Sequence, residues 1–162
     1  MKKRGLLRNQ AVKNILSVLA VPVFGMILLN LTFMLDYLFQ SVIDFGIRLF
    51  TRVDVNMAWG WFPPVKHALF VILICLISWR VFRSKLGVLL KAIYMTVPLA
   101  VVFVTIGMCL YRWPVIVYLV GGLFGIGILY YFYRSKKHWL YYYTLILVAL
   151  TLMIISLLGG EI

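Results

Sequence analysis

Acidic residues are the scarcest feature of this chain: Asp and Glu number only 4, against 16 Lys and Arg, among 162 residues. Charged residues of both signs make up 12% of the sequence, whereas hydrophobic residues make up 65%. A soluble domain carries about 25% charged residues, and a small soluble fold leaves much of its surface exposed to water. The shortage of charge therefore excludes a soluble globular domain and predicts an integral membrane protein.

Cysteine and recognisable catalytic motifs are also scarce. The two cysteines, Cys75 and Cys109, each lie within an apolar run without a CxxC pattern, which favours buried small hydrophobic residues over a disulfide or a metal site. The sequence has no HExxH, GxSxG, P-loop or acidic metal-binding motif. These absences predict no metal and no cofactor, and they favour a non-enzymatic protein over an enzyme.

Long apolar runs are what the chain has instead. Because about 20 apolar residues cross the hydrocarbon core of a bilayer, the runs predict an all-α membrane protein with five transmembrane helices. The predicted spans are residues 14–35, 65–82, 92–111, 115–133 and 139–158. A basic tail, residues 1–13, precedes a single transmembrane bundle of residues 14–162, in which residues 36–64 form an amphipathic outer segment and a loop.

Basic residues gather on one predicted face of the membrane. Twelve of the 16 fall there, namely Lys2, Lys3, Arg4, Arg8, Lys13, Arg80, Arg83, Lys85, Lys91, Arg134, Lys136 and Lys137. Since Lys and Arg concentrate in short cytoplasmic loops, we predict a cytoplasmic amino terminus and an outside carboxyl terminus, in the plasma membrane of a bacterium. This orientation accounts for the net charge of +12 without nucleic acid. It also predicts contacts with anionic lipid headgroups at the cytoplasmic face.

A polar stripe follows the first predicted span. Asp36, Gln40, Asp44, Arg48 and Arg52 recur every four residues, so they share one side of a helix. Apolar residues occupy its other sides. The pattern predicts either an amphipathic helix lying in the outer interface or a long first helix that rises out of the membrane.

Polar residues near the outer face are the candidates for a binding site or polar path. They are Asn30, Asp36, Asp44, Arg48, Arg52, Lys66, His67 and Arg112. Asp36 follows a long apolar run, and an ionisable residue inside a membrane is a functional candidate because its burial is costly. His67 could carry a proton near neutral pH. The alternative is that Asp36 begins the interfacial stripe and that His67 is structural.

Four glycines mark the fourth predicted span. Gly121 and Gly125 form a GxxxG, a spacing that lets two helix backbones approach closely in lipid. Gly122 and Gly127 widen this smooth face. The glycines predict an oligomer interface or a slot for a ligand tail, or else packing within this one chain.

The leading hypothesis from sequence is a small non-enzymatic accessory or assembly subunit that works through helix and lipid contacts, as a homo-oligomer or in a larger complex. One alternative is a small-solute transporter, channel or substrate-binding subunit with a polar path near Asn30, Asp36 and His67. A second alternative is an intramembrane enzyme acting on a lipid headgroup. It requires Arg48, Arg52, Lys66, His67 and Arg112 to converge, an expectation that a structure can decide.

Overall fold

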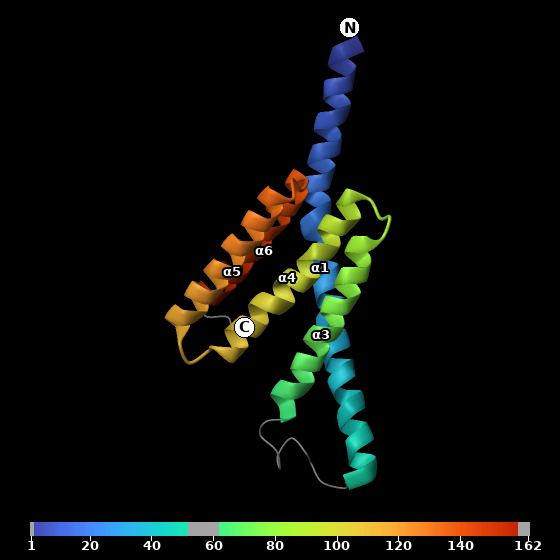
Figure 1. Ribbon diagram of the computed structural model, residues 1–162. Coiled ribbons are helices and arrows are strands. Elements are labelled where there is room, and N and C mark those ends of the chain that lie inside the picture. Colours follow the sequence, from blue (N-terminus) through green and yellow to red (C-terminus); the bar gives the residue numbers. More distant parts are fainter. Residues whose placement is uncertain (1, 52–61, 159–162) are drawn as a thin grey trace.

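The computed structural model describes residues 2–51 and 62–158, and in this part of the chain it contains helices and no strands. The helices are α1 (Lys2–Thr51), α3 (Phe62–Arg83), α4 (Val88–Cys109), α5 (Pro114–Arg134) and α6 (Trp139–Leu157) (Figure 1). Each of these five is long and apolar enough to cross a membrane. The predicted all-α class is thereby confirmed, and five helices of sufficient length and apolar composition are present, as predicted.

Consecutive helices alternate in direction, with short turns between α3 and α4, α4 and α5, and α5 and α6 (Figure 1). The ends of these helices follow from local sequence. Pro114 opens α5, where a missing N–H costs nothing. The ring of His138 accepts a hydrogen bond from the Leu140 N–H at 3.4 Å and so caps α6. The basic turns 84–87 and 135–138 lie at the end of the bundle from which α1 enters it (Figure 1).

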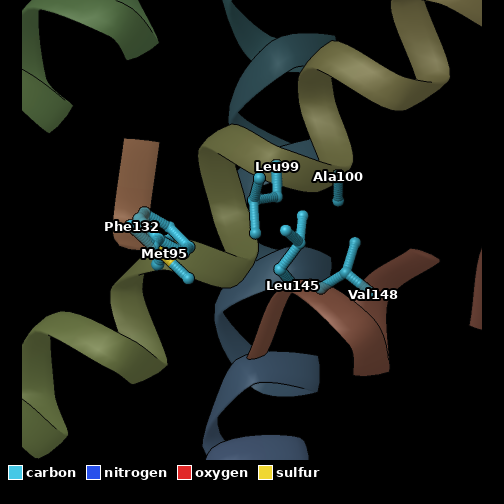
Figure 2. Packing of buried hydrophobic residues seen from close by; sticks show 6 residues of the cluster. All are labelled: Met95, Leu99, Ala100, Phe132, Leu145 and Val148. Carbon is cyan, nitrogen blue, oxygen red and sulfur yellow. The ribbon is translucent and has the colours of Figure 1, made fainter. Parts of the chain in front are cut away.

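Helix α4 is the centre of the bundle, because its buried residues face α1 on one side and α6 on the other. In Figure 2, Leu145 and Val148 of α6 point toward Leu99 and Ala100 of α4. Helix α1 packs tightly against α4 at Gly25, where an added Cβ would lie 2.8 Å from the Thr96 methyl carbon. Only glycine fits at this position without displacing a buried side chain.

Helix α1 continues without a break from Lys2 to Thr51, through Pro22. Fifty residues at 1.5 Å each make a rod of about 75 Å, more than twice the roughly 30 Å hydrocarbon core. No helix end occurs near residue 36, so the segment predicted to follow the first span is part of the same helix. Of the two alternatives that the sequence left open, the structure has the long first helix.

The start of α3 also differs from the predicted bounds. The helix begins at Phe62, with Pro63 and Pro64 in its first turn, where backbone N–H groups have no partner within the helix. The loop predicted to extend to residue 64 therefore ends earlier than expected. Its remaining residues, including Arg52 and Asp54 at its margin, lie outside the described part of the chain.

The polar stripe of α1 is turned inward rather than outward. Asp36, Gln40 and Asp44 are half-buried against the other helices, whereas the outer side of the same segment carries exposed Tyr37, Val42, Phe45, Leu49 and Phe50. A helix lying in the membrane interface would present its polar side to water. The observed arrangement is the reverse, because α3 supplies polar partners for the stripe.

Candidate functional site

An ion pair joins the carboxyl-terminal half of α1 to the start of α3. The Lys66 ammonium donates a hydrogen bond to the Asp44 carboxylate at 2.7 Å. Lys66 is almost fully buried, with 4% of its side chain exposed, while Asp44 keeps 24%. The Phe62 ring lies 5.3 Å from the same ammonium, a distance at which the ring face attracts a cation. Lys66 therefore does not extend outward from the end of its helix, as a snorkelling lysine would.

A second polar group links three helices one residue further along α3. His67 Nδ1 lies 3.4 Å from the Asp36 carboxylate of α1, and His67 Nε2 lies 3.1 Å from the Thr105 hydroxyl of α4. Gln40 donates a hydrogen bond to the other carboxylate oxygen of Asp36 at 3.0 Å. The Thr105 hydroxyl also lies 2.6 Å from the Val101 carbonyl oxygen of its own helix. We call Asp36, Gln40, His67 and Thr105 the histidine cluster.

Apolar side chains seal the histidine cluster toward the centre of the bundle. Phe39 and Phe70 place their ring centroids 5.8 Å apart, and Phe70 packs with Val97 and Val101 of α4. His67 and Asp36 keep 17% and 15% of their side chains exposed. The cluster is therefore largely, but not fully, buried.

Asn30 does not belong to the histidine cluster. It is exposed and donates a hydrogen bond to the Met26 carbonyl oxygen, one turn earlier in its own helix, at 2.8 Å. Six residues separate it from Asp36, and at about 100° per residue this places it on a different side of α1. It lines a small apolar groove between α1, α4 and α6 instead. The predicted path through Asn30, Asp36 and His67 is therefore not assembled as one continuous row.

Two of the cationic residues predicted to converge, Lys66 and Arg112, are engaged with separate partners. Lys66 is paired with Asp44. Arg112, on the α4–α5 turn, donates to the Tyr111 hydroxyl at 3.0 Å and is exposed. Arg48 is exposed on α1, and Arg52 lies outside the described residues. Since Lys66 and Arg112 have different partners, the described contacts of these two side chains give no support to a shared headgroup site.

The glycines of α5 divide into two pairs with different surroundings. An added Cβ at Gly121 or Gly125 would lie 3.8 or 3.9 Å from the Phe103 ring of α4, an ordinary packing distance. At Gly122 and Gly127 nothing described lies within 4 Å. The first pair therefore serves packing within the chain, and the second pair leaves space beside the helix.

Gly122 borders an apolar groove that is larger than the one beside Asn30. This groove, which we call the α5–α6 groove, has a volume of about 350 Å³ and an almost wholly apolar lining. Its walls come from α4, α5 and α6, and include Gly107, Gly121, Gly122, Ile126 and Ala149. Tyr118 and Ser156 close one end through a 2.9 Å hydrogen bond between their hydroxyls. Gly127 does not line it.

Thr105 is the site residue that sequence reasoning missed. A threonine in an apolar helix ordinarily bonds its own backbone, so it gave no signal alone. Its position along the helix could have indicated its role. Thr105 lies four residues before the end of α4, and His67 lies five residues after the start of α3. In antiparallel neighbours these positions are level.

Comparison with known proteins leaves the site to be interpreted on its own chemistry. The chain matches no protein-family model, no curated protein and no solved structure.

Proposed function

We propose that this protein is a small non-enzymatic membrane subunit that binds a transmembrane helix of a partner in its α5–α6 groove. The observation that carries the proposal is a glycine-lined, apolar groove beside a helix that is hardly buried. Within the described residues of α5, Phe132 alone is buried. A helix so little covered by its own chain has most of its surface available for lipid or for another helix.

Small residues make this groove suitable for a helix. Gly107, Gly122 and Ala149 come from three different helices and all border it. No large side chain at these positions keeps a partner helix away from the backbone of α4, α5 or α6. Helices associate in lipid through close backbone approach and van der Waals packing, because lipid tails are as apolar as the side chains. The small-residue lining offers a partner helix contacts that flexible acyl chains make less well.

The orientation proposed with this function puts the amino terminus in the cytoplasm. The alternating helices bring the basic turns 84–87 and 135–138 to the end where α1 enters, in keeping with the enrichment of Lys and Arg in cytoplasmic loops. Anionic lipid headgroups are the expected contacts of this end in a plasma membrane. The polar clusters of α1 and α3 then lie toward the outer face.

Photo-crosslinking in native membranes tests the groove as a partner site. Ile126 and Leu123 are both highly exposed on α5, at 64% and 68%, but only Ile126 lines the groove. A photoreactive residue at position 126 is expected to give a discrete protein adduct, and one at position 123 to give mainly lipid adducts. Lipid adducts alone at both positions would contradict the proposal.

Filling the groove supplies the matching loss of function. Gly122→Leu adds a side chain where the chain itself leaves open space, so the fold should tolerate it while the partner helix is displaced. An overpacking cost of about 1–3 kcal/mol in the complex corresponds to a loss of roughly 5- to 150-fold in affinity for the partner, and the crosslinked product should fall with it. Gly127→Leu makes the same change on the same helix outside the groove and should leave the adduct at wild-type level. Equal losses in both variants would refute a role for the groove.

A further inference from the structure

His67 is held between two partners of different chemistry. Its Nδ1 faces a carboxylate, Asp36, at 3.4 Å, and its Nε2 faces a hydroxyl, Thr105, at 3.1 Å. A carboxylate only accepts hydrogen bonds, whereas a hydroxyl can accept or donate one. A proton on Nδ1 is therefore favoured in either charge state of the ring, since a bare nitrogen lone pair would face the carboxylate oxygen. Nε2 is then the ring nitrogen that gains or loses a proton.

The Thr105 hydroxyl has one proton and two acceptors within reach. The Val101 carbonyl oxygen lies 2.6 Å away, and His67 Nε2 lies 3.1 Å away. When the ring carries two protons, Nε2–H donates to Thr105 and the hydroxyl donates to Val101. When the ring is neutral, the Thr105 hydroxyl donates its hydrogen bond to Nε2 and no longer to the Val101 carbonyl oxygen. Rotation of one hydroxyl satisfies both states without moving a helix.

We propose that His67 is a proton-binding site within the bundle, and that the gain or loss of its proton moves the Thr105 hydroxyl between His67 and Val101. The inference does not depend on the partner-binding groove, which is lined by other residues. Histidine suits this role because it changes charge between pH 5 and pH 8. When the ring carries two protons, two hydrogen bonds in series connect α3 to the α4 backbone, and when the ring is neutral the connection ends at the Thr105 hydroxyl.

The charged groups around His67 come from α1 and from its own helix. Asp36 and, two turns further, Asp44 face it from α1, with exposed Arg48 beyond them. On α3, Lys66 precedes it and is paired with Asp44. The α4 side contributes Thr105, which is neutral. The carboxylate of Asp36 is thus the charge in direct contact with the ring.

Nuclear magnetic resonance on the whole protein in detergent micelles, from pH 5 to pH 8, tests the proposal. On raising the pH, the His67 ring ¹⁵N signals are expected to change from doubly protonated to protonated on Nδ1 alone. The Val101 carbonyl ¹³C signal is expected to shift with the same midpoint, because it loses the Thr105 hydrogen bond. The chain has two histidines, so His138→Gln identifies the His67 signals and should preserve both changes.

Two substitutions at position 105 test whether the Thr105 hydroxyl carries the effect of the His67 proton to Val101. Thr105→Val keeps the side-chain shape and removes the hydroxyl, so the pH-dependent shift at Val101 should be lost while His67 still titrates. Thr105→Ser restores the hydroxyl and should restore the shift. A Val101 shift that survives in Thr105→Val, a neutral His67 protonated on Nε2, or a His67 signal that stays constant from pH 5 to pH 8 would each overturn the proposal.

Discussion

Replacement of Asp44 by leucine is expected to lower the free energy of unfolding by about 3–5 kcal/mol, the usual cost of removing one partner from a buried ion pair. Lys66 keeps only 4% of its side chain exposed, and its ammonium lies 2.7 Å from Asp44. Without the carboxylate, the ammonium loses its charged partner in a place that water reaches poorly. Reversible unfolding in mixed detergent micelles measures the loss.

The partner substitution distinguishes a charge effect from a packing effect. In the double variant Asp44→Leu with Lys66→Met, no charge stays buried, and replacement of a buried pair by apolar residues is often neutral. Most of the lost stability should therefore return. Asp44→Asn, which keeps an oxygen near the ammonium, should cost less than Asp44→Leu. A single-variant cost below about 1 kcal/mol, the range of exposed pairs, would contradict a buried pair.

Replacement of Phe132 by alanine is expected to cost about 3–5 kcal/mol, as typical for a large buried aromatic. Within the described residues of α5, Phe132 is the buried one. Its ring lies 5.9 Å from that of Tyr141 and 5.6 Å from that of Tyr142, and it belongs to the cluster with Met95 (Figure 2). Its loss removes the main packing contact that holds α5 against α4 and α6.

The neighbouring residue supplies the control. Tyr133 is 77% exposed on the same helix turn, and Tyr133→Ala should stay within about 0.5 kcal/mol of wild type, as surface substitutions usually do. Unfolding in mixed micelles again gives the comparison. If both variants were equally destabilised, α5 would not be anchored through Phe132.

The helices themselves could be read from the sequence, because a membrane imposes a length and an apolar composition on every span. The same composition hid where α1 ends. Residues after Asp36 remain apolar on three sides of the helix, so hydropathy could not separate a new interfacial helix from a continuation. The stripe of Asp36, Gln40 and Asp44 was visible from its spacing. Its direction depended on Lys66 and His67, which only the tertiary structure brings alongside.

The glycines show the same limit for the candidate site. Spacing in the sequence identified a smooth face on α5 but could not distinguish Gly121 from Gly122, one residue apart. The Phe103 ring of α4 occupies the space beside Gly121, whereas Gly122 faces the open α5–α6 groove. Thr105 was missed for a related reason. A residue becomes part of a site through neighbours that lie far away in the sequence.

The most direct measurement is the distance between two spin labels on α1, one on either side of Asp36. Leu19 and Phe45 are both exposed, and Cys75 and Cys109 can first be replaced by serine. One continuous helix predicts about 39 Å between the two backbone positions, from 1.5 Å per residue. A helix that turned into the membrane interface near residue 36 would give about 29 Å for a right-angle bend. The longer distance is the expected result, and the shorter one would contradict the continuous helix whose acidic side faces α3 and α4.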